Sequence, residues 1–205
     1  MGLFEFISFS KLPQCFVERV GEDENFIANS DVHNITPIIT ENPKPKFQKR
    51  ALDLFSGTGS VGQRLKEWGY EFISVDINPN AGADICTDVL RWSVQKIFPP
   101  GYFDIVAAGV PCQEYSVAKT VGKRNLKLAD RIVKKTLEII SYLNLNHWWI
   151  ENPRTGWLKT RPFMRNLPFI DIDYCQFSEW GYQKPTRIWC SESIAHLKNI
   201  LCDGE

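Results

Sequence analysis

Short apolar runs that stop at a glycine or a polar residue recur along residues 50–191, with helical patterns between them. ALDLF stops at the glycine turn SGTGS, YEFISVD stops at Asp76, and FDIVAAG stops just before PCQEYS. Strands that alternate with helices and are apolar nearly throughout are typical of parallel strands covered on both faces. The pattern therefore predicts an α/β fold, a three-layer sandwich around a doubly wound sheet.

The same periodicities predict the remaining elements. Helices are expected over four segments: VGQRLKEWG, DVLRWSVQKIF, residues 125–143 and residues 192–201. Strands are expected over three more: HWWIEN, IDIDYC and TRIWC. Ligands bind such sheets in a crevice at the carboxyl ends of the strands. The segments that follow strand ends should therefore meet in one crevice: SGTGS, Asp76, PCQEYS and ENP.

The length of 205 residues suits one domain. We expect residues 1–49, which end in a proline-rich stretch, to be an N-terminal extension, and residues 50–205 to form the domain. We see no apolar run long enough to span a bilayer and no signal peptide, which predicts an intracellular protein, cytoplasmic or nuclear, without membrane contact.

The six cysteines form no CxxC pair, and the three histidines are scattered. We therefore expect neither a metal site nor a disulfide framework. The net charge is zero, but residues 119–135 carry seven bases against Asp130 alone, and residues 154–165 carry four bases and no acid. Such a basic face could hold phosphates, with Lys123 and Arg124 as candidates, although a solvated helix face explains the charge equally well.

DLFSGTGSVG, residues 53–62, combines a strand end, a glycine turn and a helix start. Its glycines allow a ligand to approach the backbone closely, and Asp76 could accept both hydroxyls of a ribose. A structural turn, with Asp76 capping INPN, remains an alternative. Asp88 could cap a helix or contact an adenine amine. These residues alone fit a nicotinamide enzyme as well as a methyltransferase.

Three residues further along suggest chemistry on a base. Cys112 lies on the loop after a strand, in the expected crevice, where a cysteine is a candidate nucleophile. Glu151 follows two tryptophans and an isoleucine, so its pKa should be raised by burial, as suits a proton donor. Arg187 lies within a strand pattern, where its guanidinium needs a partner.

Taken in order, six segments resemble the DNA cytosine-5 methyltransferase family, especially small forms of phages and large DNA viruses: DLFSGTGSVG, VDINP, TDVLRW, GVPCQEYS, IENP and QKPTRIW. The likeness covers about residues 50–191. It implies the Rossmann-like class I methyltransferase fold, S-adenosylmethionine as cofactor, and methylation of cytosine C5 in DNA, either non-specific duplex or single-stranded.

The resemblance also implies roles for individual residues. Cys112 corresponds to the nucleophile that attacks C6, Glu151 to the acid at N3 and the exocyclic amine, and Arg187 to the arginine near O2. The implied cofactor-binding residues are Phe55, Ser56, Gly57, Thr58, Gly59, Asp76, Ile77, Asp88, Val89 and Pro111. The implied substrate-binding residues are Gln113, Tyr115, Ser116, Lys123, Arg124 and Arg154.

The sequence departs from the family pattern at several places. Pro153 replaces the usual valine after Glu-Asn, and Pro185 replaces the first arginine of the last motif. Only 15 residues follow IWC, so we expect the family's target-recognition domain and C-terminal motifs to be absent, and a partner protein could supply recognition. RNA, single-stranded DNA or a nucleotide as substrate, a non-catalytic subunit, and a nicotinamide oxidoreductase remain alternatives.

Overall fold

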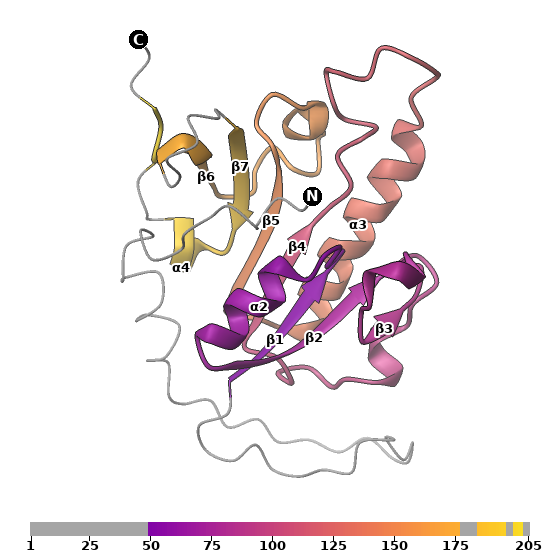
Figure 1. Ribbon diagram of the computed structural model, residues 1–205, viewed down its shortest axis with the longest axis vertical. Coiled ribbons are helices and arrows are strands. Elements are labelled where there is room, and N and C mark those ends of the chain that lie inside the picture. Colours follow the sequence, from indigo (N-terminus) through magenta and orange to yellow (C-terminus); the bar gives the residue numbers. More distant parts are fainter. Residues whose placement is uncertain (1–48, 177–183, 196–198, 203–205) are drawn as a thin grey trace.

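The computed structural model describes residues 49–176, 184–195 and 199–202. The described residues form one seven-stranded sheet in the order β3-β2-β1-β4-β5-β7-β6, flanked by helices (Figure 1). The strands are β1 Lys49–Leu54, β2 Tyr70–Asp76, β3 Ile85–Cys86, β4 Ile105–Gly109, β5 His147–Pro153, β6 Phe169–Asp173 and β7 Pro185–Cys190. The expected N-terminal extension lies outside the described residues, apart from Lys49.

Five neighbouring strands, from β3 to β5, run parallel. Their order reverses between β1 and β4, which makes this the switch point where a doubly wound sheet opens its crevice. Strand β7 differs from the expected parallel pattern, because it runs antiparallel to both of its neighbours, β5 and β6. Only 11 residues separate β6 from β7, fewer than the dozen or so that a crossover between parallel strands needs, which agrees with their antiparallel pairing.

Two α-helices cover opposite faces of the sheet. Buried residues of β1 and β4 alternate between two core clusters: Leu52 and Val106 belong to the cluster with α3 (Leu126–Leu143), and Ala51 and Ile105 to the cluster with α2 (Ser60–Glu67). This alternation is the direct result of the strand period of two. The predicted three-layer sandwich is confirmed, with α2 and α3 drawn on different sides of the strands in Figure 1.

Helix α3 matches its predicted bounds to within one residue. The side chain of Asn125 accepts the Leu128 amide at 3.1 Å as an N-cap, and Asn144 closes the helix with a left-handed backbone at φ 52°. The buried stripe of α3 faces the sheet: Ala129, Val133, Thr136, Ile139, Ile140 and Leu143. Of the part of the chain that is described, no helix is long and apolar enough to cross a membrane.

The helix predicted over DVLRWSVQKIF is wrong. The segment makes a turn, in which the Arg91 and Trp92 amides donate to the Asp88 carbonyl, and then the single 3-10 turn η4 (Val94–Lys96). Trp92, Val94 and Phe98 are all buried in one cluster. The apolar spacing of this segment therefore reflects a compact loop packed on the core and not one face of a helix. The two-residue strand β3 was not predicted. In the described part of the last predicted helix, residues 192–201, only α4 (Glu192–Ala195) is observed as a helix; residues 199–201 are not helical, because Ile200 pairs with Ile172 on β6.

We expected no disulfide framework, but the structure contains one disulfide. Cys175 and Cys202 are joined, with their Cα atoms 6.8 Å apart. The chain end returns along the outer strand β6, where the Ile200 amide donates to the Asp171 carbonyl at 3.0 Å and the Asp173 amide donates to the Ile200 carbonyl at 2.8 Å. This pairing brings together two cysteines that lie 27 residues apart, which their spacing does not reveal.

Candidate active site

The glycine turn lies at the carboxyl end of β1. Phe55, Gly57 and Gly59 all have positive φ angles, of 61°, 52° and 77°. The Phe55 and Ser56 amides both donate to the carbonyl of Val75, at 2.8 and 3.2 Å, which presses the turn against β2. Left-handed backbone is tolerated mainly by glycine, so the two glycines permit this tight path. Ser56 is buried, whereas Gly57 and Thr58 are exposed.

Two carboxylates brace this turn. Asp76 accepts the Gly57 amide through one oxygen and the Asn78 amide through the other, each at 2.8 Å. Asp53 accepts the Gly62 amide at 3.1 Å, inside the first turn of α2. Burial raises the pKa of the Asp53 carboxyl to about 7, the Gly62 hydrogen bond opposes this shift, and the Asp76 charge adds to it.

The cofactor-binding residues predicted beside the turn leave room for a ligand. A methyl group added to Gly59 would meet no atom within 4 Å, so the turn is open on that side. Ile77, directly after Asp76, exposes 66% of its surface, which is unusual for a large apolar residue next to a buried strand. An open glycine turn, an exposed apolar side chain and a carboxylate fit an adenosine-containing cofactor.

The other predicted cofactor-binding residues differ in their burial and in the contacts of their side chains. Asp88 caps its turn, because its carboxylate accepts the Leu90 amide at 2.9 Å, which agrees with the capping interpretation. Val89 is 6% exposed and belongs to the core, so its side chain faces inward and only its backbone remains for a ligand. Phe55 packs partly against the same core, and Pro111 is half-buried.

Cys112 and Glu151 lie at the ends of adjacent parallel strands. Gly109, the last residue of β4, pairs in register with Glu151 on β5. The side-chain amide of Asn152 donates to the Val110 carbonyl at 3.0 Å, which fastens the loop that carries Cys112 to β5. The predicted meeting of these two segments at one edge of the sheet is therefore present in the structure.

The environment of Glu151 is that of a buried acid. Glu151 is 5% exposed, and its Oε1 atom makes no hydrogen bond within the described residues. Burial raises the pKa of its carboxyl to about 7, with Lys184 acting in the opposite direction. Burial first and the Glu151 charge second also raise the pKa of the half-buried Cys112 thiol, while Lys184 lowers it.

Lys184 is the cation that faces this pair, and the sequence analysis missed it. Its pKa is lowered by burial, and the Glu151 and Cys112 charges raise it. Its ammonium also lies 5.4 Å from the ring centre of Tyr174. The signal was present: residues 184, 186 and 188 fall on one face of a strand, but which face meets Glu151 depends on a pairing that sequence alone does not give.

Arg187, predicted to lie in the site, is turned away from it. In register, Ile188 is opposite Glu151 and Arg187 is opposite Asn152, so the Arg187 and Glu151 side chains point to opposite faces of the sheet. The guanidinium binds both carboxylate oxygens of Asp171, at 2.7 and 2.8 Å, and lies 3.6 Å from the ring centre of Phe169. The partner that the Arg187 guanidinium needs is therefore Asp171 on β6.

Several predicted substrate-binding residues instead hold the Cys112 loop in shape. Tyr115 is fully buried, and its hydroxyl donates to Asp130 at 2.9 Å. Arg124 donates to three carbonyl oxygens of the loop and lies 4.2 Å from the ring centre of Trp157. Arg154 pairs with Asp173 at 3.0 Å. Each of these three side chains is therefore held by partners within the protein in this structure.

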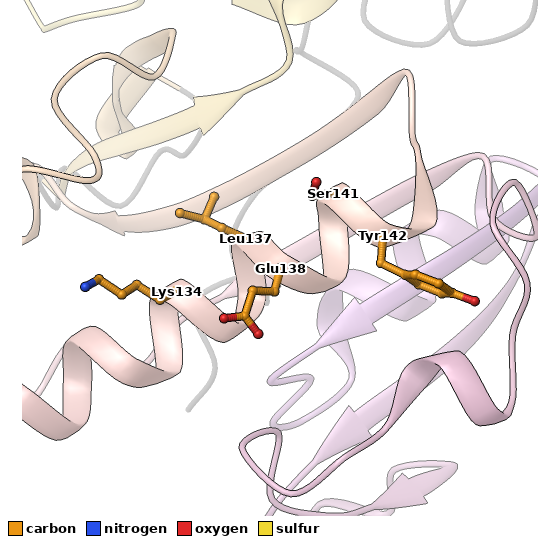
Figure 2. A pocket seen from close by; sticks show the side chains of 5 residues that line it. All are labelled: Lys134, Leu137, Glu138, Ser141 and Tyr142. Carbon is orange, nitrogen blue, oxygen red and sulfur yellow. The ribbon is translucent and has the colours of Figure 1, made fainter.

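The three other predicted substrate contacts keep more freedom. Gln113 and Lys123 are exposed, and the Ser116 hydroxyl accepts the Ala118 amide at 3.2 Å. Within the described residues, no group of histidine, cysteine and acidic side chains could hold a metal ion. A shallow hollow on the outer side of α3 contains none of the predicted site residues; it is lined by Lys134, Leu137, Glu138, Ser141 and Tyr142 (Figure 2).

The sheet is parallel except for its reversed strand β7, and the glycine turn with Asp76 lies at its carboxyl edge. The loop that carries Cys112 meets the end of the strand that carries Glu151 at the same edge. Together these features define a class I S-adenosylmethionine-dependent methyltransferase. No protein-family model matches the chain. The chain is 35% identical over 153 residues to the "Probable DNA (cytosine-5)-methyltransferase" of Frog virus 3 (isolate Goorha), covering 68% of this chain and 69% of that one. The chain belongs to the DNA (cytosine-5)-methyltransferase family.

Solved structures resemble the chain more distantly. A SAM dependent methyltransferase from Archaeoglobus fulgidus has a TM-score of 0.44 and 14% identity, over 71% of this chain and 86% of that one. The PH0226 protein from Pyrococcus horikoshii OT3 gives 0.36 and 15%, over 52% and 47% of the two chains. The YcgJ protein from Bacillus subtilis gives 0.35 and 14%, over 51% and 44%.

Proposed function

We propose that this chain methylates the C5 carbon of cytosine in DNA through a transient covalent bond between the Cys112 sulfur and C6. The observation that carries the proposal is the buried Glu151 carboxyl, whose Oε1 atom lacks a hydrogen-bond partner among the described residues and whose pKa is raised to about 7. It stands beside a half-buried thiol. A buried acid with a vacant hydrogen-bonding position is suited to receive a polar ring atom.

The C5 carbon of cytosine is a weak nucleophile. Addition of the Cys112 thiolate at C6 moves electron density toward C5, and transfer of the Glu151 proton to N3 keeps that density from building up as charge on the ring. S-adenosylmethionine, when bound, would supply an electrophilic methyl group for C5 and be released as S-adenosylhomocysteine. Water then removes the C5 proton, the freed electron pair restores the C5–C6 double bond and expels the thiolate, and the N3 proton returns to Glu151.

The charges around Cys112 decide when it can react. An ionised Glu151 repels the thiolate, and a protonated Glu151 does not, so the reactive form pairs a neutral acid with a charged sulfur. Lys184 is the cation that stabilises that thiolate in our proposal. Target recognition supplied by a partner protein remains a prediction.

The proposal is tested by trapping on duplex DNA that carries 5-fluorocytosine, with S-adenosylmethionine present. Fluorine at C5 cannot leave as a proton does, so the enzyme should remain bound to the DNA through Cys112. We expect a denaturation-resistant adduct with the unchanged protein and none with Cys112→Ser, which should still bind cofactor in calorimetry. Equal loss of cofactor binding would show that Cys112 has a structural role.

The same assay separates the remaining substrates. Single-stranded DNA, RNA and cytidine nucleotides that carry the same fluorinated base form the parallel arms. A target inside a duplex must leave the base stack at a cost of a few kcal/mol, so single-stranded DNA should react at least as readily as duplex. An adduct confined to RNA or to the nucleotide would overturn DNA as the substrate, and the absence of any adduct would overturn the covalent route.

A further inference from the structure

Basic residues are concentrated in the segment that begins at the Cys112 loop and extends past Glu151. Residues 111–168 contain 11 lysines and arginines and four acids, in a chain whose total charge is zero. This stretch includes the Cys112 loop, α3, the end of β5 and η5 (Trp157–Thr160). The excess positive charge therefore lies next to the candidate active site rather than being spread over the molecule.

The structure separates these cations into two groups. Five are bound by partners within the protein: Lys119 by Glu114, Arg161 by Asp130, Lys135 by Glu138, Arg154 by Asp173 and Arg124 by loop carbonyls. Six are exposed and have no acidic partner among the described residues; they are Lys123, Lys127, Arg131, Lys134, Lys159 and Arg165. We call these six the basic surface.

The members of the basic surface belong to two segments that are tied together. Lys127, Arg131 and Lys134 recur at intervals of four and three residues, which places them in one row on the exposed face of α3, about 10 Å long. The segment after η5 is fixed to this helix by the ion pair between Arg161 and Asp130, and by Lys134, whose ammonium lies 5.2 Å from the ring centre of Phe163.

An ordinary solvated helix face carries acids and bases in alternation. Along α3 the acids are Asp130 and Glu138, and each already binds one cation, Arg161 and Lys135 respectively. The row of three cations is therefore left uncompensated, and a regular polyanion is the ligand that complements such a row. The active site beside it acts, in our proposal, on a base within such a polyanion.

We infer that the basic surface binds the phosphate backbone of the DNA that flanks the target cytosine. This inference rests on the proposed function and names the face of the molecule on which the substrate lies. Each cation that contacts a phosphate releases condensed counterions, so binding should weaken steeply as salt concentration rises. Contacts of this kind fix the position of the strand without reading its sequence.

The experiment measures binding of labelled duplex DNA between 50 and 200 mM salt, with the full chain and without cofactor. Lys127→Gln/Arg131→Gln should weaken binding about tenfold per cation at roughly 0.1 M salt and lower the slope of log affinity against log salt by about two. The matched control is Lys66→Gln/Lys96→Gln, which removes the same charge from exposed sites outside the basic surface.

We expect the control to retain the slope of the unchanged protein, and the charge-conserving pair Lys127→Arg/Arg131→Lys to restore it. Equal weakening by both glutamine pairs would show that net charge alone governs binding and would overturn the inference, as would no weakening by either. Trapping through Cys112 is scored separately. Binding that depends on the basic surface without adduct formation would reject the covalent reaction and leave the surface standing.

Discussion

Two buried carboxyls of this molecule have a pKa raised to about 7, and the surroundings of each give it a different role. Asp53 accepts a hydrogen bond from the Gly62 amide, so its oxygen is occupied by the fold. Glu151 keeps one oxygen without a partner in the described part of the chain. Burial alone raises the pKa of an acid, and the vacant oxygen is what favours Glu151 as the one that meets a substrate.

At the residue scale, we predict the pH dependence of methyl transfer. The reactive form needs Glu151 protonated and Cys112 ionised, so kcat/KM should rise with pH up to about 7, stay level, and fall once the pH exceeds the raised pKa of the thiol. Glu151→Gln should lower kcat about 10²- to 10⁴-fold. The remaining activity should continue to rise past pH 7 and level off only above the raised pKa of the thiol, because residue 151 no longer titrates.

The measurement is the rate of methyl transfer to cytosine-containing DNA across pH 5.5–10, in an assay that resolves rate changes of ~10²-fold. Glu67→Gln provides the control, since this carboxyl is exposed on α2 and lies outside the site. A Glu151→Gln profile that still levels off near neutral pH would assign that ionisation to another group.

At the scale of elements, α2 begins without a capping side chain of its own. Gly59 occupies its N-cap position in a left-handed conformation, and the amide of Gly62 is instead satisfied by Asp53 from the preceding strand. Gly62 also packs tightly, because an added methyl group would approach the Phe72 ring to 2.4 Å. The glycine turn is thus held by the strand that leads into it and by the one beside it.

This cap predicts a pH-dependent stability. The Asp53 carboxyl has a folded pKa of about 7, above its ordinary value of 3.8, so its stabilising contribution is complete below that ordinary value and is lost progressively as the pH rises to about 7. Asp53→Asn removes this titration and should flatten the dependence of the free energy of unfolding on pH. In the unchanged protein the slope of that dependence due to Asp53 is at most about 1.4 kcal/mol per pH unit. Denaturant unfolding at pH 5 and pH 8 measures it, with Glu67→Gln as the control, and parallel profiles for Asp53→Asn and the unchanged protein would refute it.

Most of the elements could be predicted from the sequence, because their signals are local. The helix over residues 125–143 and the strand ending at Asp76 follow from periodicity and capping residues. The irregular turn after Asp88 could not be predicted, since tertiary burial of Trp92 and Phe98 overrides the helical pattern. The places of Lys184 and Arg187 depend on the register of β7, which is set by long-range pairing.

At the scale of the whole molecule, the chain end covers an edge. The outer strand β6 is paired on its free side by the segment around Ile200, and the Cys202 amide donates to the Asp173 carboxylate at 3.1 Å. Covering an outer strand in this way prevents its exposed amides from pairing with another molecule. The disulfide between Cys175 and Cys202 fixes this cover covalently.

The disulfide gives a prediction for the whole fold. Closing a loop of 27 residues lowers the entropy of the unfolded chain, which corresponds to about 3–4 kcal/mol. A reducing agent should therefore lower the free energy of unfolding by about that amount, and Cys202→Ser should make the protein insensitive to the reducing agent. Cys86→Ser, at a free exposed cysteine, should keep the sensitivity, and identical unfolding with and without reducing agent would contradict the prediction.

The antiparallel return of β7 has one more consequence. Side chains on either side of a strand exchange faces when the chain slips by a single position. A slip of β7 by one residue against β5 would carry the ammonium of Lys184 out of the crevice and turn the guanidinium of Arg187 toward it. Which cation lies near the sulfur is therefore decided by the register of β7, so comparisons across lineages should establish that register before comparing residue identities.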